Sequence, residues 1–490
     1  MLARLSVWLR LAEEPDPLPL PKLDEVIIQG DSLQQDTWRT LPSGYDVIIG
    51  NPPFMPFGTV ASKAELAERF KTAQGRFDYS YLFVELAIQR LGQGGLLGMV
   101  VPNRLFRNRD ASNLRLLLAD SASLLAVVDF GSNEVFKGTS AYIGAVIARR
   151  NLTANSLDAS FRFVRVLKLT PRFMGLLLAM AAREHGEERN DYLKAFDVRH
   201  PRGGGVWLFL APSVMSARIR LEEGSEPLSA YAGIFQGIKV GANDLYILTP
   251  QSAIREQLIS VTNGLGDTHL LETSLLRPVV YGSDIRQYDR VRPNKFLLYP
   301  YRNDRLISED ELQQEYPYTY KYFSVYRSAL EARGSISAGG KEWYELVRRR
   351  DERWLNSKKL LMRDLAVQTA FAIDDLGSAY LVGGTPVVPQ DSEMLFPLLG
   401  YLNSGLVNWY LNPMTPAFRA DFQKFEPQHL EGIPVLDEVV AGGAVGEEIG
   451  ALAKQLLELG DVDSTRRTEL RRNIDVILAR LIGVDPSELS

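Results

Sequence analysis

The chain of 490 residues contains no cysteine, and this absence removes several kinds of chemistry. Disulfide bridges, thiolate metal sites and cysteine nucleophiles are all excluded. Histidine is nearly as scarce, because the four histidines are scattered without the spacing of metal ligands. No apolar run approaches the ~18 residues that span a bilayer. We therefore expect a cytoplasmic protein with no bound metal and no contact with a membrane.

The composition that remains is that of an ordinary globular protein. It is 46% hydrophobic, 23% charged and 10% aromatic, and the length is sufficient for several domains. The net charge of −5 argues against a chain coated in nucleic acid. It leaves room for a local basic groove, because binding of an anion follows the local field rather than the total charge.

Residues 1–150 alternate between helical spacing and short apolar runs. The runs "DEVIIQGDS", "YDVIIG", "LLGMVVP", "LLAVVDF" and "AYIGAVIARR" have the character of buried strands. This alternation predicts an α/β fold with a doubly wound, Rossmann-like sheet. Ligands of such folds bind beyond the carboxyl ends of the strands. Asp31 and Asn51 both follow apolar runs and are expected at such ends.

A change in sequence character predicts where the domains divide. The stretch "HPRGGGVW" has three glycines beside a proline and is expected to be a linker. Short runs, many aromatics and frequent turn signals follow it, as in a mixed α+β domain. Two amphipathic helices are expected beyond Glu447. The predicted domains are 1–200, 205–435 and a C-terminal helical segment at 436–490.

The tip "NPPF", Asn51 to Phe54, is stiffer than an ordinary turn. Asn51 offers a side-chain oxygen as an acceptor, and Pro52 offers a carbonyl whose position is restricted because proline fixes φ. Phe54 adds a flat apolar face. Two acceptors and a ring suit a planar group that bears an NH2, such as adenine. Acceptors on both amine hydrogens would aim the nitrogen lone pair at an electrophile, which is catalysis by positioning and electrostatics.

These residues resemble the catalytic motif of the adenine-N6 DNA methyltransferases, [DN]PP[YF], whose cofactor is S-adenosylmethionine. The neighbouring segments "IIQGDSL", "FDYSYLFVELAIQRLGQGGLLGMVVPNRLF" and "LLAVVDFG…EVFKGTSAYIGAVIARR" resemble the same family in the order of its gamma class. The resemblance implies a base-flipping enzyme of a restriction–modification or phage-defence system. It assigns residues by role: Asn51, Pro52, Pro53 and Phe54 to catalysis, Phe54 and Phe136 to stacking on the flipped base, and Asp31, Ser32, Phe83 and Asn51 to the cofactor.

The C-terminal half resembles the target-recognition domain of Type IIG restriction–modification methylases. The segments that carry this resemblance are "IFQGIKVGANDLYIL", "LLRPVVYGSDIRQY" and "YLNSGLVNWYLNPMTPAFRADFQKFEPQHLEGIPV". It implies double-stranded DNA as the partner. Residues with side chains suited to base edges and phosphates are expected to contact the DNA. The candidates are Lys239, Asn243, Arg286, Arg419 and Lys424.

Each assignment also has a purely structural explanation. Asn51 to Phe54 could be a turn, Asp31 a helix N-cap, Phe83 an ordinary core residue and Phe136 an aromatic that closes the core. The run "RRRDERWLNSKK" at 348–359 could bind phosphate. Its mixed charges, however, predict a solvated helical face.

One part of the family pattern is missing. The cofactor site of the family begins with a Gly-rich loop before the segment matched by "IIQGDS", and this sequence has no glycine before Gly30. The predicted "DEVIIQ" strand would then lack a neighbour, and "YDVIIG" would have an open edge, which promotes aggregation. Three explanations stay open: a fragment, a split enzyme completed by an upstream-encoded chain, and a degenerate methylase.

Other functions are compatible with this pattern. A non-catalytic DNA-recognition subunit would keep the second domain and lose cofactor binding. Methylation of RNA or protein would keep the fold without this recognition domain. The sequence contains no nuclease signature with acidic–acidic–Lys spacing, so any coupled cleavage is assigned to a separate nuclease.

Overall fold

The structure is a computed structural model of the chain. It describes residues 7, 23, 26–34, 43–55, 63–131, 133–136, 142–151, 160–170, 174–175, 177, 186–255, 257–337, 339–415, 417–419, 422–440, 442–460 and 463–489. Contacts divide the chain into two compact units, Met1–Phe209 and Leu210–Ser490. No helix among the described residues is both long and apolar enough to cross a bilayer.

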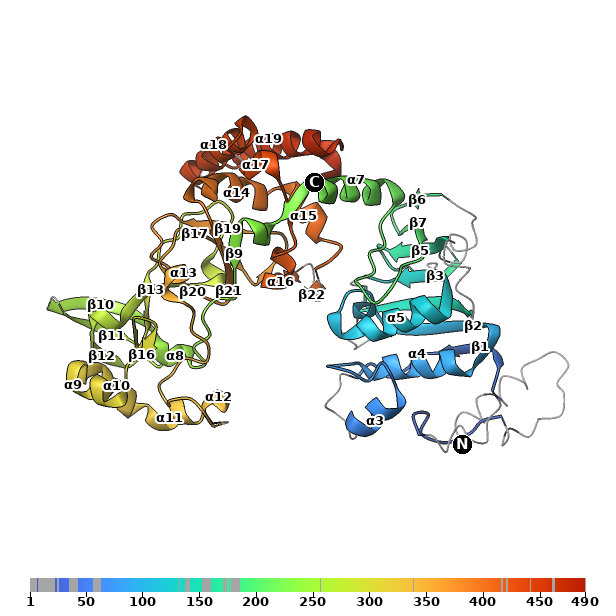
Figure 1. Ribbon diagram of the computed structural model, residues 1–490, viewed down its shortest axis with the longest axis horizontal. Coiled ribbons are helices and arrows are strands. Elements are labelled where there is room, and N and C mark those ends of the chain that lie inside the picture. The colour runs from blue at the N-terminus through green and yellow to red at the C-terminus, as the bar shows by residue number, and fades with distance from the viewer. Residues whose placement is uncertain are drawn as a thin grey trace. The chain divides into compact units, whose positions relative to one another are not determined.

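Unit 1 is built on a seven-stranded sheet with the order β1-β2-β4-β3-β5-β7-β6 (Figure 1). β1 is parallel to β2, whereas β4 is antiparallel to both of its neighbours, β2 and β3. β1, β2 and β3 therefore run in one direction and end at the same edge of the sheet. The strands are β1 Tyr45–Gly50, β2 Leu91–Pro102, β3 Ala122–Asp129, β4 Ile143–Arg150, β5 Ser160–Val166, β6 Glu188–Arg189 and β7 Leu193–Arg199.

Helices cover one face of this sheet, and the α/β prediction is confirmed. α4 (Tyr79–Arg90) packs on β2, and α5 (Ser112–Ser121) packs on β3 (Figure 1). α3 (Lys63–Arg69) and the 3-10 turns Asn103–Phe106 and Arg109–Ala111 complete the regular structure described in unit 1.

The other face is uncovered at β1. Val47 is 55% exposed and Ile49 is 78% exposed, although both lie in an apolar strand. β1 is also one of the two edge strands of the described sheet. An apolar strand in this position presents both a free edge and a free face.

The structure corrects one strand prediction and leaves two helix predictions untested. Residues 26–30, within the predicted "DEVIIQ" strand, form a turn and bends, with Val26 73% and Ile28 47% exposed. A strand is stable only when a neighbouring strand accepts its backbone hydrogen bonds, whereas here the backbone N–H groups of Val26 and Ile27 donate to the carbonyl of Leu23 within a turn. The spacing of "LARLSVWLRLA" predicts a helix at the start of the chain, and a second helix is expected after Pro171. Most of both segments lies outside the described residues.

The triple-glycine stretch expected to be a linker is held by unit 1. Arg115 of α5 is 1% exposed, and its guanidinium donates to the carbonyls of Gly204 at 2.9 Å and Gly205 at 2.6 Å. It also donates to Leu105 at 2.8 Å and Asn108 at 2.7 Å. Four carbonyl partners satisfy the buried cation and fix the chain just before the unit boundary.

Unit 2 combines several small sheets with helices. The largest has six strands in the order β12-β11-β10-β14-β13-β20, and a four-stranded sheet has the order β19-β17-β21-β9. The strands are β8 Ser225–Pro227, β9 Ala232–Ile234, β10 Ile247–Arg255, β11 Leu258–Thr262, β12 Thr268–Glu272, β13 Leu276–Tyr281, β14 Lys295–Leu298, β15 Tyr301–Arg302, β16 Arg305–Leu306, β17 Lys359–Arg363, β18 Leu365–Ala366, β19 Phe371–Asp374, β20 Tyr380–Val382, β21 Gly384–Pro389, β22 Ala417–Arg419, β23 Phe422–Lys424 and β24 Pro434–Leu436.

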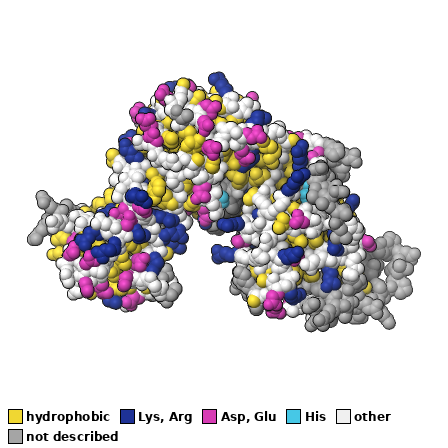
Figure 2. All heavy atoms as spheres, in the orientation of Figure 1, with side chains coloured by type: hydrophobic (Ala, Val, Ile, Leu, Met, Phe, Trp, Pro, Cys, Tyr) yellow, Lys and Arg dark blue, Asp and Glu magenta, His cyan; other side chains and the backbone are white. Residues whose placement is uncertain are grey.

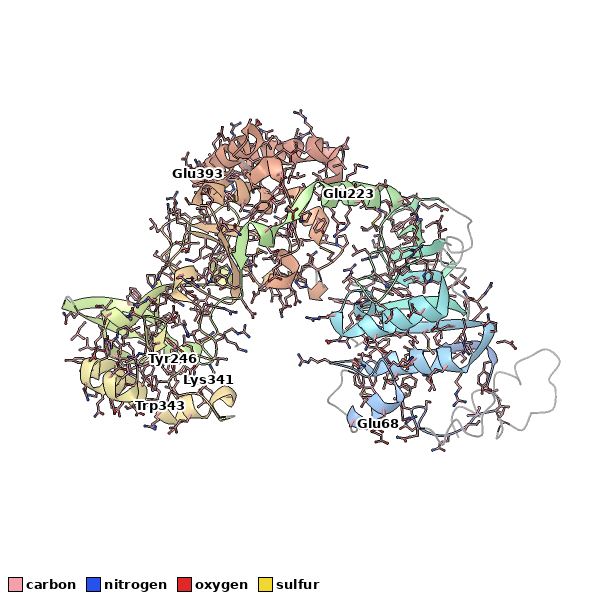
Figure 3. The ribbon with its side chains drawn as sticks, viewed as in Figure 1. Glu68, Glu223, Tyr246, Lys341, Trp343 and Glu393 are labelled. Atoms are coloured by element: carbon pink, nitrogen blue, oxygen red, sulfur yellow. The ribbon has the colours of Figure 1, made fainter. Side chains whose placement is uncertain are left out.

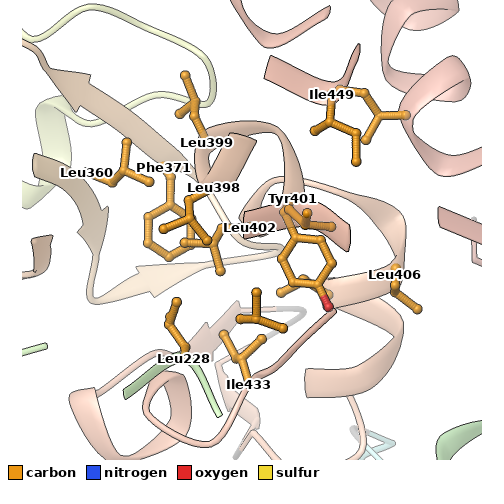
Figure 4. Packing of buried hydrophobic residues seen from close by; sticks show 14 of the residues in the cluster. Leu228, Leu360, Phe371, Leu398, Leu399, Tyr401, Leu402, Leu406, Ile433 and Ile449 are labelled. Atoms are coloured by element: carbon orange, nitrogen blue, oxygen red, sulfur yellow. The ribbon is translucent and has the colours of Figure 1, made fainter. Parts of the chain in front are cut away.

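The C-terminal helices belong to the main core of unit 2. Tyr401 and Leu398 of α14 pack in one buried cluster with Ile449 of α18, Phe371 of β19 and Leu360 of β17 (Figure 4). The three-part division of the chain stays a proposal. The helices are α7 Pro212–Glu223, α8 Asn243–Tyr246, α9 Glu309–Glu315, α10 Pro317–Val325, α11 Arg327–Glu331, α12 Gly334–Ser337, α13 Glu352–Leu355, α14 Leu395–Leu402, α15 Gly405–Leu411, α16 Pro427–Leu430, α17 Asp437–Val440, α18 Ala444–Leu459 and α19 Ser464–Ile482.

The same buried carboxylate contact occurs once in each unit. In unit 1, Glu85 of α4 is 1% exposed and accepts from Thr72 through its backbone N at 2.9 Å and its Oγ1 at 2.7 Å. In unit 2, Glu272 at the end of β12 accepts from the N and Oγ1 of Thr319 at the same two distances, 2.9 and 2.7 Å. Each carboxylate fixes a turn of chain by satisfying its backbone donors.

Candidate active site

Polar residues stand at the ends of β1, β2 and β3, which are parallel strands of the unit 1 sheet. Asn51 follows β1, Asn103 follows β2, and Asp129 is the last residue of β3. Carboxyl ends of parallel strands are where ligands of such sheets bind. Asn103 and Asp129, which the sequence pattern did not single out, therefore lie at the same edge of the sheet as Asn51.

The Asn51–Phe54 tip is fixed on two sides. Its first residue continues β1, and the carbonyl of Met55 accepts from the backbone N of Tyr79 at the start of α4, at 2.9 Å. Asn51 is exposed, and its side chain makes no hydrogen bond within the described part of the chain. Its oxygen is therefore available to a ligand, while the surrounding backbone is held in place.

The two prolines and Phe54 differ in exposure. Pro52 is buried and Pro53 is exposed. Phe54 is partly buried and packs against a cluster that includes Val128, Phe130 and Ile143. One part of its ring thus supports the core and the rest faces outward, so the assignment of Phe54 to base stacking stays a prediction.

Asp31 lies within electrostatic reach of the start of α4. Burial raises the pKa of the Tyr79 hydroxyl, and the negative charge of Asp31 raises it further. Asp31 itself is exposed, and its Oδ1 accepts from the backbone N of Leu33 at 2.9 Å. Asp31 thus follows a turn rather than the end of a strand, and Ser32 is partly buried beside it.

Tyr79 lies near two of the predicted cofactor residues, Asp31 and Phe83. Phe83 is partly buried and lies four residues after Tyr79 on α4, so the two rings share one face of the helix. Tyr79 and Phe83 thus lie on one face of α4, the charge of Asp31 acts on Tyr79, and the backbone N of Tyr79 joins the helix to Met55 next to the tip. Sequence reasoning missed Tyr79, although its helical spacing from Phe83 was a usable signal.

The N-terminus of α4 is rigid for a definable reason. Asp78 is 2% exposed and caps the helix by accepting from the backbone N of Ser80 at 3.0 Å. Its other oxygen forms an ion pair with Arg104, which follows β2. The cap therefore links the helix that carries Tyr79 and Phe83 to the carboxyl edge of the sheet.

Asp129 organises the ends of β2 and β3. It is 3% exposed, its carboxylate accepts from the backbone N of Gly131 at 2.8 Å, and it pairs with Arg165 at 3.0 Å. Asn103 Nδ2 approaches the same carboxylate at 3.5 Å. Burial lowers the pKa of the nearby Arg107 guanidinium, and the charge of Arg165 lowers it further. This network joins the ends of β2 and β3, at the same edge of the sheet as Asn51.

Phe136, the second predicted stacking residue, is 41% exposed in the loop after β3. Residues 137–141, which follow Phe136 in the chain, lie outside the described residues. Its role on the flipped base stays a prediction.

The predicted DNA-contact residues of unit 2 are mostly on the surface. Lys239, Asn243 and Arg286 are exposed. Lys424 of β23 is partly exposed and forms an ion pair with Glu426 at 2.6 Å, so a phosphate would compete with that carboxylate. Arg419 is part of β22, and its side chain lies outside the described parts.

Two family models match separate parts of the chain. One, described as Eco57I restriction-modification methylase, matches residues 1–136. The other, described as TaqI-like C-terminal specificity domain, matches residues 277–435. The first covers the strand ends described above, and the second lies within unit 2.

Curated relatives resemble most of the chain. The Type II restriction enzyme and methyltransferase RM.Eco57I of Escherichia coli is 26% identical over 82% of this chain, which spans 42% of that protein. The Type II methyltransferases M.BstVI of Geobacillus stearothermophilus and M.PaeR7I of Pseudomonas aeruginosa are 21% and 24% identical over 85% and 92% of this chain. The chain spans 71% and 75% of those two proteins.

Among solved structures, the Type IIL restriction-modification enzyme MmeI in complex with DNA has a similar fold. Its TM-score is 0.56 at 13% identity, over 90% of this chain and 54% of MmeI. The similarity therefore extends through both units.

Proposed function

Because the chain carries an Eco57I-type restriction–modification methylase segment followed by a TaqI-like specificity domain, we propose that it methylates DNA. The reaction is transfer of a methyl group from S-adenosylmethionine to the N6 amine of adenine at a specific site, within a restriction–modification or phage-defence system of the cytoplasm. The exposed Asn51 at the fixed tip after β1, with no hydrogen bond within the described residues, is the observation that carries this proposal.

The residues of the tip act on the target amine. The side-chain oxygen of Asn51 and the carbonyl of Pro52 accept the two amine hydrogens, which directs the nitrogen lone pair outward. Pro53 stiffens the tip, and Phe54 and Phe136 stack on the adenine after it leaves the duplex.

The residues along α4 fit the cofactor. The Asp31 carboxylate can accept from an exocyclic amine or a hydroxyl, Ser32 adds a polar side chain, and the ring of Phe83 can pack on a purine. Bound there, S-adenosylmethionine supplies an electrophilic methyl group on a sulfonium. Asn51 would face both the cofactor methyl and the target amine.

The second unit supplies recognition of double-stranded DNA. The TaqI-like match covers residues 277–435, and Lys239, Asn243 and Arg286 are exposed in the same unit. Arg419 and Lys424 lie on β22 and β23 within the matched range. These five residues are proposed as contacts to phosphates and base edges.

We also propose that a further polypeptide segment completes the sheet at β1. Val47 and Ile49, at 55% and 78% exposure, support this proposal, because an additional strand or helix would bury them. An upstream-encoded chain is one source of the segment. Cleavage of DNA is assigned to a separate nuclease. A non-catalytic recognition subunit, the alternative function, would bind DNA and not the cofactor.

The decisive test combines calorimetry with a methyl-transfer assay. S-adenosylmethionine is titrated into this chain alone and into a mixture with the product of the upstream gene, and transfer of labelled methyl to duplex DNA is then measured. Binding only in the mixture establishes a split enzyme. DNA binding without cofactor binding in either sample leads to the recognition-subunit alternative.

Asn51→Ala separates catalysis from cofactor binding. We expect at least ~100-fold slower methyl transfer, as for loss of one positioned polar contact in other active sites, with little change in cofactor affinity. Asn113→Ala on α5 removes an asparagine from the same unit and is the matched control. Equal activity of both variants would refute the role of the tip.

A further inference from the structure

Two cations lie side by side in unit 2, on chain segments that are far apart in sequence. Lys239 and Arg348 form an antiparallel bridge, with Lys239 N donating to Arg348 O at 3.1 Å and Arg348 N donating to Lys239 O at 2.9 Å. Both side chains are exposed. Residues paired in this way have Cβ atoms roughly 5 Å apart on one face, where like charges repel. Such an arrangement is stabilised by an anionic ligand.

This position corrects the prediction of a solvated helix at 348–359. Helix α13 contains only residues 352–355, and Arg348 to Arg350 precede it in extended chain. In extended chain, the side chains of consecutive residues such as Arg348 and Arg349 point to opposite sides. Neither charge therefore screens the other. The extended conformation of residues 348–350 is set by pairing with the segment around Lys239. A local sequence pattern does not reveal this pairing.

Both segments are fixed by buried neighbours. Ile238 and Val240 flank Lys239 at 2% and 1% exposure, and Leu346 shortly before Arg348 is 0% exposed. Lys341 Nζ donates to the carbonyls of Leu346 and Val347, each at 3.1 Å. Figure 3 labels Lys341 in the same lobe of unit 2 as Tyr246 and Trp343. The cations thus project from a rigid base.

A third cation extends the group. Arg350 Nε donates to the carbonyl of Gln236 at 2.6 Å, which leaves the rest of its guanidinium for a ligand. Arg348 bonds the Gln236 side-chain oxygen. Burial lowers the pKa of Arg350, and the charge of Arg348 lowers it further.

Carboxylates nearby are already engaged by other arginines. Asp304 pairs with Arg349 at 2.7 Å, and Asp351 pairs with Arg353 at 2.8 Å. Lys239, Arg348 and Arg350 form no ion pair with any residue in the described ranges. Their positive charge is therefore uncompensated within the part of the chain that the structure describes.

An aromatic cavity adjoins this group. It has a volume of about 650 Å³, and its lining includes Phe235, Arg350 and Trp354. The Phe235 and Trp354 rings are 6.0 Å apart, and the Arg350 guanidinium lies 6.0 Å from the Phe235 ring. Trp354 is 38% exposed, so apolar ring surface is available beside the cations. Figure 2 shows Lys and Arg side chains gathered on the lobe of unit 2 that carries β10–β12 and α9–α12.

We propose that Lys239, Arg348 and Arg350 form a strip that binds successive phosphates of one strand of duplex DNA, with Trp354 packing against the adjoining deoxyribose. The proposal rests on the proposed function for the identity of the ligand. It adds Arg348, Arg350 and Trp354, which the mixed charges of the run at 348–359 had assigned to a solvated helical face. Because phosphate contacts are the same at every sequence, the strip positions the duplex and does not read bases.

The test measures the salt dependence of binding to a fluorescent duplex by anisotropy, with the full chain and no cofactor. We expect Lys239→Gln/Arg348→Gln to reduce the slope of log K against log salt by ~1.8, which corresponds to two lost phosphate contacts. Affinity at low salt should fall by roughly tenfold or more. Trp354→Leu should weaken binding by roughly fivefold and leave the slope unchanged, because it removes no charge.

The control is Arg305→Gln/Arg327→Gln, which removes the same charge from exposed arginines paired with Glu311 and Glu331. An unchanged slope in the control supports the strip, and thermal unfolding verifies that each variant folds. Equal slopes for both double variants, or wild-type binding by the first, would overturn it. A fluorescent ATP probe is titrated into the same variants. If the first double variant loses binding of this probe but binds the duplex normally, the cavity is instead assigned to a small anion. Because no methyl transfer is measured, failure of the proposed catalysis leaves this result interpretable.

Discussion

The single side chain of Arg115 joins separate segments of unit 1. Its buried guanidinium donates to carbonyls on both the 3-10 turn region and the triple-glycine stretch. Arg115→Met keeps the volume of the stem but removes the donor to those carbonyls, of which that of Leu105 is buried. We expect unit 1 to lose about 3 kcal/mol of its free energy of unfolding, measured by urea denaturation. The exposed Arg109→Met is the control, and a loss equal to that of the control would contradict this account.

The buried ion pair of unit 2 makes a second prediction at this scale. Lys359 and Asp374 are 1% and 3% exposed and lie opposite each other on β17 and β19, 2.7 Å apart. Lys359→Met should destabilise the unit by about 3–5 kcal/mol, because Asp374 is left as an unpaired buried charge. The double variant Lys359→Met/Asp374→Leu should recover much of that loss. Additive losses in denaturation would refute the coupling.

Individual site residues differ in how readily sequence reveals them. Asn51 and Pro52 stand out because a proline pair after an apolar run is chemically unusual. Asp129 and Asn103 look ordinary in sequence, and their meeting depends on the order of strands in the sheet. Arg348 was assigned to a solvated helix because its charged neighbours dominate the local pattern. Only long-range pairing with Lys239 reveals its position.

Among the elements, periodicity predicted the helices and strands of the sheet in unit 1. β1, β2, β3 and β4 all coincide with apolar runs in the sequence, because strands buried by neighbours need continuous apolar side chains. The run around Val26 to Ile28 has the same composition and forms no strand. Apolar composition is therefore insufficient where no partner strand supplies hydrogen bonds.

β1 makes a prediction at the scale of the element. Ile49→Lys should reduce concentration-dependent aggregation at unchanged stability, because that side chain is 78% exposed at an outer strand. Ile48→Lys is the control on the opposite face, where Ile48 pairs with the buried Leu97. It should destabilise unit 1 by roughly 1–3 kcal/mol. Light scattering and denaturation distinguish the two, and equal effects would show that β1 is covered.

At the scale of the whole molecule, the two units should respond separately to acid. His200 in unit 1 is 6% exposed and accepts from the backbone N of Leu124 at 2.9 Å. Burial lowers the pKa of His200, so the unfolded chain takes up a proton first as the pH falls below ~6.5. Stability of unit 1 is then lost from that pH down to the lowered folded pKa, by at most ~1.4 kcal/mol per pH unit from this histidine.

Variants separate the histidines of the two units. His200→Gln should flatten the pH dependence of unit 1 in urea denaturation between pH 7.5 and 5. Burial likewise lowers the pKa of His429 in unit 2, where it accepts from Glu426 N at 3.1 Å. His429→Gln should therefore leave the unit 1 transition unchanged. A pH dependence of unit 1 that persists without His200 would assign it to other groups.

The α/β half could be predicted from sequence more completely than the second half. Unit 1 repeats one simple pattern, whereas unit 2 divides its chain among several short sheets joined by distant partners such as β9 with β21 and β8 with β24. A strand of three residues leaves too short a pattern to detect.

The Glu85–Thr72 and Glu272–Thr319 contacts constrain how this sequence can drift over evolutionary time. Loss of Glu85 leaves four protein donors without its carboxylate, and loss of Glu272 leaves three. Each threonine therefore contributes to stability only while its glutamate is present. Neutral replacement of one member alone is therefore disfavoured. Homologous chains should retain both members of each pair or have exchanged both, and the two pairs should vary independently because they lie in separate units.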